Sequence, residues 1–268
     1  MAARTVVTAG FRTAFEEHGN GPALVLVHGV GLRGEVWAPQ VEVFARDRRV
    51  VVFDTLGHGG SARPPAGATL ADYLAQLQGL LDAVELERAA LVGHSMGAAI
   101  ATAFAIEHPE RVTALAALCP VYGRSAEARA AALARARTLE RDGPAATVDA
   151  TLARWFGDGD AAPGDRRKAG MLRDWLTGAD PVGYARAYRV FVSSDETLAG
   201  RLGAISAPAL FAAAEHDPNS TPQMSERMAR EAPRGVAAVV PNARHMVPFT
   251  SPAPVNAMLG AFLREHDR

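Results

Sequence analysis

The chain has 268 residues, 49% of them hydrophobic, which is enough for one large core or for one core with an inserted subdomain. Its formal net charge is −1, so nothing in the composition indicates nucleic acid or an anionic membrane as a partner. The single cysteine, Cys119, excludes an internal disulfide; the first residues carry no apolar signal region, and no stretch is long enough to span a bilayer. We therefore expect a cytoplasmic protein, either a monomer or a homodimer.

Strands and helices are predicted to alternate through the first 120 residues. An antiparallel pair comes first, at Thr5–Thr8 and Phe11–Glu16. Apolar runs that are typical of buried strands in a parallel sheet follow at Ala23–Val27, Arg49–Phe53, Ala89–Val92 and Val112–Leu118. Helices are predicted between them, at Val36–Ala45, Thr69–Val84 (with Thr69 as its N-cap) and Met96–Glu107. This alternation predicts a doubly wound α/β fold.

The alternation stops after Cys119-Pro120. Residues 121–200 are helical in pattern and rich in alanine and arginine, and they show no clear strand. Strands resume at Pro208–Ala214 and Gly235–Val240, and a helix is predicted at Pro254–Arg264. We therefore predict a core made of residues 1–120 and 201–268, with residues 121–200 inserted as a helical cap or lid.

The pentapeptide Gly93-His94-Ser95-Met96-Gly97 joins a predicted strand to a predicted helix. A Gly-x-Ser-x-Gly sequence in that setting indicates a nucleophile elbow, in which a strained turn projects the serine hydroxyl from the sheet. The pentapeptide alone is a weak signal, because a glycine-rich turn can contain a serine by chance. Ser95 is the candidate nucleophile.

A serine nucleophile needs a base, and the base needs an acid that orients it. Asp217 and His245 each follow a predicted strand, in the chain order serine, acid, histidine. Most loop aspartates are turn residues and most histidines are structural, so position after a strand is what favours these two. Glu215 remains an alternative acid, and His216 is interpreted as a loop residue.

The loop His28-Gly29-Val30-Gly31 directly follows the Ala23–Val27 strand. Its glycines would let the amide of Val30 face the pocket, and the amide of Met96 would be a second donor to an oxyanion. His28 is expected to orient this loop, and it is also a candidate substrate contact. No cluster with metal-ligand spacing and no dinucleotide fingerprint is recognised, so neither a metal nor a cofactor is expected.

Several of these motifs recur at the ends of predicted strands: His28-Gly29, Asp54, Gly57-His58-Gly59, Ser61, Gly93–Gly97, Asp217 and His245. Together they resemble the α/β-hydrolase superfamily over nearly the whole chain outside residues 121–200. The resemblance implies a mostly parallel eight-stranded sheet with helices on both faces and a helical cap after the sixth strand. It also implies a Ser95–His245–Asp217 triad with Val30 and Met96 as the oxyanion hole.

Within that superfamily, the chain is similar to the 3-oxoadipate enol-lactonases around Ala153–Phe156, Tyr184–Phe191 and Gly203–Leu210. This resemblance implies a small substrate that carries a carboxylate. The chain departs from that branch at His94, Ala214 and Phe249–Pro252, which leaves ester, lactone, amide and carbon–carbon bond hydrolysis open. A cofactor-free oxygenase, a perhydrolase and a ligand-binding protein are further alternatives on the same fold.

Side chains of the cap are the candidates for contact with a small-molecule substrate. Trp155 and Tyr188 are candidate pocket residues, although aromatic residues at helical spacing are more often core. Arg124, Arg154 and Arg189 are candidate carboxylate ligands, because arginine binds carboxylate in a bidentate way. In a chain this rich in arginine, each is more often a solvated residue.

Overall fold

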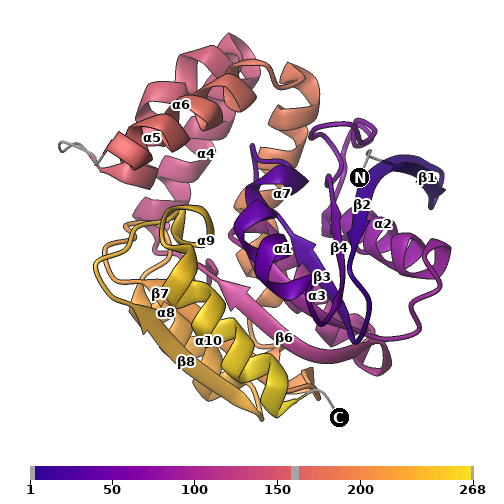
Figure 1. Cartoon of the computed structure of the whole chain (residues 1–268). Coiled ribbons are helices and arrows are strands. Elements are labelled where there is room, and N and C mark those ends of the chain that lie inside the picture. The colour runs from indigo at the N-terminus through magenta and orange to yellow at the C-terminus, as the bar shows by residue number, and fades with distance from the viewer. Residues whose placement is uncertain (1–3, 158–162, 267–268) are drawn as a thin grey trace.

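An eight-stranded sheet runs through the molecule (Figure 1). The computed structural model describes residues 4–157 and 163–266. The strands are β1 (Arg4–Thr8), β2 (Phe11–His18), β3 (Ala23–Val27), β4 (Arg49–Phe53), β5 (Ala89–His94), β6 (Val112–Leu118), β7 (Ala209–Ala214) and β8 (Gly235–Val240). Their order is β1-β2-β4-β3-β5-β6-β7-β8, and only the β1–β2 and β2–β4 pairs are antiparallel. The predicted mostly parallel sheet is therefore confirmed.

Helices cover both faces of the sheet (Figure 1). In the sequence before and after the cap region they are α1 (Ala38–Phe44), α2 (Leu70–Ala83), α3 (Met96–Glu107), α8 (Pro222–Glu231), α9 (Val247–Thr250) and α10 (Pro252–Glu265). α1 contacts α10 on one face, and α2 contacts α3 on the other. Thr69 is the N-cap of α2 as predicted, and its amide donates to Asp72 Oδ2 at 2.8 Å. The helix predicted from Val36 begins instead as a 3₁₀ turn, Gly34–Trp37, and becomes α-helical only at Ala38.

The order of the strands determines where a site can form. β3 pairs with β4 on one side and with β5 on the other, so the chain changes direction across the sheet at β3. The carboxyl ends of β3 and β5 are therefore neighbours, and loops leaving them diverge to opposite faces. Ligands of open parallel sheets bind in such a crevice.

The segment between β6 and β7 is built from helices α4 (Ala126–Asp142), α5 (Val148–Phe156), α6 (Pro163–Thr177) and α7 (Pro181–Leu198). α4, α5 and α6 gather beyond the end of the sheet, at the upper left of Figure 1. α7 packs against α4 and also against α3, so it links the segment to the helices of the sheet. The division into a core and a cap at residues 121–200 stays a prediction, and residues 158–162 lie outside the described part of the chain. Among the described residues, no helix combines the length and apolarity needed to cross a membrane.

Candidate active site

Ser95 occupies the tight turn between β5 and α3. Its backbone has φ 55° and ψ −113°, a left-handed conformation that non-glycine residues rarely adopt. The amide of Ser95 donates to the carbonyl of Leu118 at 2.9 Å, and its carbonyl accepts from the first turn of α3. These bonds hold the strained turn in place, which is the arrangement expected for a nucleophile elbow.

The two glycines of the pentapeptide are required because no room exists for a side chain at either position. A Cβ on Gly93 would lie 2.1 Å from the carbonyl oxygen of Gly97, and a Cβ on Gly97 would lie 2.0 Å from the carbonyl oxygen of Val27. Real Cβ atoms do not approach backbone this closely. The absence of side chains at both positions therefore lets α3 start directly against β3 and β5.

Ser95, His245 and Asp217 form a hydrogen-bonded chain. The Oγ of Ser95 lies 3.1 Å from Nε2 of His245, and Nδ1 of His245 lies 2.6 Å from Oδ2 of Asp217. All three are buried, at 3%, 4% and 3% exposure respectively. Order along the chain and position after predicted strands pointed to these three residues, and the loops after β5, β7 and β8 bring them together.

The carboxylate of Asp217 fixes the tautomer of His245. Burial would raise the pKa of Asp217, but the charge and hydrogen bond of His245 hold that pKa below its usual value. The amides of Asn219 and Ser220 assist by donating to Oδ1 at 2.8 and 3.2 Å. Because an ionised carboxylate only accepts, Nδ1 of His245 carries the proton and Nε2 is free to accept from Ser95.

The alternative acid, Glu215, lies away from this chain. Its side chain is 46% exposed, and its Oε2 accepts from the amide of Asn242 at 2.8 Å. His216 is also about half exposed and has Glu215 as its nearest carboxylate, at 3.9 Å. Both residues belong to the outer side of the β7–α8 loop, and neither reaches Ser95.

The loop after β3 lies beside Ser95. Val30 lines the cavity into which the serine opens, and Met96 is the first residue of α3. Neither backbone amide, of Val30 or Met96, donates to an acceptor within residues 4–157 and 163–266. Two unpaired amides next to a serine are suited to binding an oxyanion, and the positive end of the α3 dipole adds to this.

Two buried histidines form hydrogen bonds with that loop. His28 donates from Nδ1 to the carbonyl of Gly29 at 2.8 Å and accepts at Nε2 from the amide of Thr55 at 2.9 Å. His58 accepts from the amide of Gly31 at 2.8 Å. Burial lowers the pKa of His28, and it lowers that of His58 to about 3, so both rings are neutral. His28 therefore supports the loop and does not line the cavity, which corrects the expected substrate contact.

His94 in the elbow has a similar supporting position. Its Nε2 donates to the carbonyl oxygen of His245 at 2.8 Å. Burial first, and the nearby His245 second, lower the pKa of His94 to about 3. A neutral ring that binds this carbonyl ties the loop carrying His245 to the turn carrying Ser95.

A cavity of about 290 Å³ opens over Ser95 and His245. Four of the side chains expected to contact substrate line it: Arg124, Arg154, Trp155 and Tyr188. The indole of Trp155 stacks on the imidazole of His245, with ring centres 6.1 Å apart. Arg189 lies outside this cavity, because its guanidinium pairs with Glu140 on the surface.

Arg135 also lines the cavity, although it is not among the residues predicted to contact a substrate. The lining positions Ala128, Ala131 and Arg135 of α4 are three and four residues apart along the chain. That is the spacing of one helix face. This spacing could have indicated a cavity-facing side of α4, but alanines lie on every face of the helix, so the sequence does not distinguish that side.

One group of possible metal ligands occurs among the described residues, namely His94, Cys119 and His245, with ligand atoms within 4.8 Å of one another. It is unsuited to a cation. Both nitrogens of His245 are engaged by Asp217 and Ser95, and burial raises the pKa of the Cys119 thiol well above its usual value. A metal here would break the hydrogen-bonded chain.

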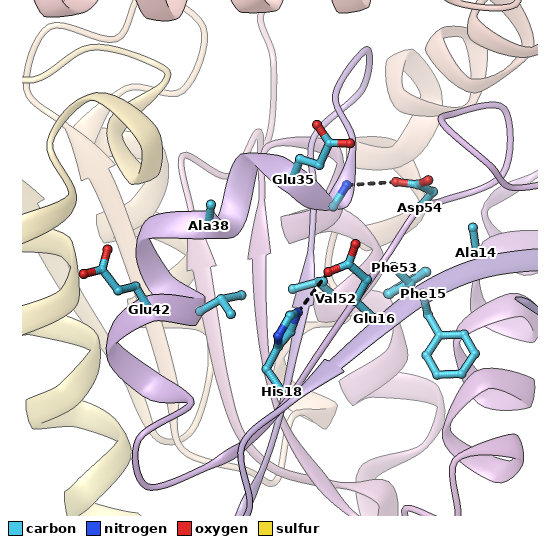
Figure 2. A pocket seen from close by; sticks show the side chains of 12 residues that line it. Ala14, Phe15, Glu16, His18, Glu35, Ala38, Glu42, Val52, Phe53 and Asp54 are labelled. Carbon is cyan, nitrogen blue, oxygen red and sulfur yellow. Dashed lines mark hydrogen bonds and ion pairs between the residues drawn. The ribbon is translucent and has the colours of Figure 1, made fainter. Parts of the chain in front are cut away.

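A second cavity, of about 370 Å³, lies beside β2, β4 and α1 (Figure 2). It is lined by acidic and apolar side chains, and its lining includes neither serine nor cysteine. Some of its polar groups are already used within the protein: Glu16 pairs with His18 at 3.0 Å, and Asp54 accepts from the amide of Gly34 at 2.9 Å. The cavity beside Ser95 is therefore the candidate active site.

Comparisons with known proteins agree with this architecture. Residues 22–252 match the family model described as alpha/beta hydrolase fold. The chain is 36% identical over 264 residues to an (E)-2-((N-methylformamido)methylene)succinate hydrolase of Acinetobacter baylyi, covering 98% of both chains. Among solved structures, it is similar to the enol-lactonase from Burkholderia xenovorans LB400, with a TM-score of 0.89, 27% identity and coverage of 97% of this chain and 100% of that one. It is also similar to a thermophilic esterase from Thermogutta terrifontis in a malate-bound structure, with a TM-score of 0.87, 27% identity and full coverage of both. The chain belongs to the α/β-hydrolase fold family.

Proposed function

We propose that this protein is a serine hydrolase that cleaves the acyl bond of a small ester, lactone or amide through an acyl-enzyme on Ser95. The observation that carries the proposal is the hydrogen-bonded chain from Ser95 through His245 to Asp217 at the wall of a cavity. A serine hydroxyl becomes a nucleophile when a neutral imidazole can accept its proton, and the carboxylate stabilises the imidazolium that forms.

The proposed reaction proceeds in two halves. Ser95 attacks the carbonyl carbon while His245 takes the proton, and the amides of Val30 and Met96 stabilise the oxyanion. His245 then gives the proton to the leaving oxygen or nitrogen, which leaves the acyl group on Ser95. Water, deprotonated by His245, attacks this ester, and His245 returns the proton to the Oγ of Ser95 as the acid is released.

The similar proteins support this class of bond. The Acinetobacter relative is named a hydrolase of a substrate that contains an amide, and the Burkholderia structure is named an enol-lactonase, so an amide and a lactone both occur in the names of similar proteins. A cavity of about 290 Å³ lies at the lower end of the range for ligand pockets, which favours a small substrate.

The test is a turnover screen of short acyl esters, lactones and amides with the wild-type chain and Ser95→Ala. We expect Ser95→Ala to lose roughly 10⁴-fold or more of kcat, since the three residues act as a unit. Ser193→Ala is the matched control, because Ser193 is an exposed residue of α7 outside the cavity, and it should retain wild-type turnover. Near-wild-type turnover by Ser95→Ala, or oxygen uptake without any acyl hydrolysis, would overturn the proposal.

A further inference from the structure

The cavity beside Ser95 has a cationic wall. Three arginines line it, Arg124, Arg135 and Arg154, and among its described lining residues there is no aspartate or glutamate. Such a wall raises the local concentration of anions, and a small enclosed cavity strengthens the effect.

Arg135 and Arg154 are held only by neutral groups. Nε of Arg135 donates to the hydroxyl of Tyr188 at 3.1 Å. Arg154 donates to the carbonyl of Ala150 at 2.8 Å and to Oγ1 of Thr151 at 3.0 Å, both on its own helix α5. Within the described parts of the chain, neither guanidinium has a carboxylate within 4.0 Å. Their uncharged partners orient them without neutralising them.

Leaving two such charges together is unfavourable in the free protein. Both side chains are partly buried. Burial lowers the pKa of Arg154 and the charge of Arg135 also lowers it, whereas the nearby Tyr188 raises it. Both guanidiniums line the same cavity, where their like charges repel. A bound anion would relieve this repulsion and satisfy the donors that remain.

We propose that Arg135 and Arg154 form a subsite for a doubly charged dicarboxylate group, so that the substrate is a small dicarboxylate whose acyl bond faces Ser95. This inference rests on the proposed function for the scissile bond and deepens it by naming the rest of the molecule. Arg154 is adjacent in sequence to Trp155, which stacks on His245, and the same 290 Å³ cavity contains both arginines and the serine. One small molecule can therefore contact both the two arginines and Ser95.

Two guanidiniums without an acid between them favour a ligand that carries two negative charges. A monocarboxylate would neutralise one of the two charges and leave the other partly buried and unpaired, which is costly. A dicarboxylate matches both. Arginine is also suited to the planar, bidentate geometry of a carboxylate.

The test compares succinate with butyrate, which has the same carbon chain and one carboxylate, as inhibitors of p-nitrophenyl acetate hydrolysis. We expect succinate to have an inhibition constant at least about tenfold lower, since hydrogen bonds to charged groups contribute roughly 1.5–3 kcal/mol each. In Arg135→Gln and Arg154→Gln, the ratio of the two inhibition constants should fall toward one. Equal inhibition by succinate and butyrate in the wild-type chain would overturn the subsite.

Arg137→Gln is the matched control. Arg137 lies on α4 two residues from Arg135, but it is exposed and does not line the cavity. The control should keep the wild-type turnover and the wild-type ratio of inhibition constants. If the ratio falls equally in Arg137→Gln, the preference for succinate comes from the overall charge of the protein, which would contradict the subsite.

Calorimetric titration of succinate into Ser95→Ala separates this inference from the proposed function. If succinate binds Ser95→Ala but not the double variant Ser95→Ala, Arg154→Gln, the subsite is supported even where no ester is cleaved. No binding to Ser95→Ala, with p-nitrophenyl acetate hydrolysed normally by the wild-type chain, would overturn the subsite and leave the hydrolase intact.

Discussion

The residue types at this site are required by the space between backbone segments as much as by side-chain chemistry. Ser95 has a positive φ, and the glycines on either side of it have room for hydrogen only. The pentapeptide therefore carries two kinds of information: which atom attacks, and how closely β3, β5 and α3 can approach. The sequence showed the glycines but not this close approach, because Gly97 contacts Val27 on a different strand.

Gly97→Ala should be strongly destabilising. Its Cβ would lie 2.0 Å from the backbone oxygen of Val27, so β3 or α3 must move. We expect a loss of about 3 kcal/mol or more in the free energy of unfolding, measured by urea denaturation. Gly170→Ala is the control, since Gly170 is an exposed position of α6 where an added Cβ would meet no atom within 4 Å, and the variant should be neutral or stabilised by about 0.5–1 kcal/mol. Similar free energies for the two variants would contradict the spatial argument.

Asp217→Asn should keep the fold and lose activity. An amide cannot hold His245 in the tautomer that leaves Nε2 free, and loss of the carboxylate leaves the imidazolium unstabilised. We expect kcat to fall by roughly 10³- to 10⁴-fold on whichever acyl substrate the wild-type chain cleaves. Glu215→Gln removes the same charge two residues earlier in the chain, on the exposed side of the loop, and it should retain activity. The opposite ranking of the two variants would make Glu215 the acid.

The strands of the sheet and the helices α2, α3 and α10 were predicted from the sequence, whereas α8, α9 and the packing of α4 to α7 were not. Apolar runs such as Ala23–Val27 and Val112–Leu118 mark strands buried on both faces, and their bounds agree with the structure. The helices of the inserted segment are rich in alanine and arginine, so their periodicity does not single out a face. This is why Arg154 was predicted as a cavity residue and Arg135 was overlooked.

The junction between α7 and the sheet depends on a close backbone contact. A Cβ on Gly57, which has φ +84°, would lie 2.5 Å from the carbonyl oxygen of Gly183 in the first turn of α7. The exposed ion pair of Arg63 with Asp180, at 2.7 and 2.8 Å, spans the same junction. Exposed ion pairs contribute little, so the backbone contact dominates.

Gly57→Ala should therefore destabilise the protein more than Arg63→Ala does. The left-handed conformation and the clash together are expected to cost about 2–4 kcal/mol in the free energy of unfolding. Arg63→Ala should leave the melting temperature nearly unchanged. Thermal denaturation of both variants checks this, and a larger drop for Arg63→Ala would show that the ion pair holds α7.

Buried neutral histidines make the stability of the molecule depend on pH. Burial lowers the folded-state pKa of His28, and that of His58 and His94 to about 3, while an unfolded histidine titrates near 6.5. Between these values the unfolded chain binds more protons, so the free energy of unfolding is fully present above about pH 6.5 and falls as pH is lowered. The lowered pKa of Asp217 acts in the same direction, at more acidic pH.

We expect each of these three histidines to contribute about 1.4 kcal/mol per pH unit to the slope well below pH 6.5, measured by urea denaturation between pH 7 and pH 5. His58→Gln should reduce the slope, because its amide oxygen can still accept from Gly31 but does not titrate. His216→Gln, at a half-exposed position, should leave the slope unchanged. A flat stability profile over this range would mean that the histidines are not buried in neutral form.

The hydrogen-bonded chain at Ser95 is tested most directly by covalent labelling. The wild-type chain is incubated with a fluorophosphonate, and the adduct is measured by intact mass and mapped by peptide mass spectrometry. We predict one adduct per chain, on Ser95, which is absent from Ser95→Ala and strongly slowed in His245→Ala. No adduct on the wild-type chain, or equal labelling of Ser95→Ala, would contradict an activated Ser95.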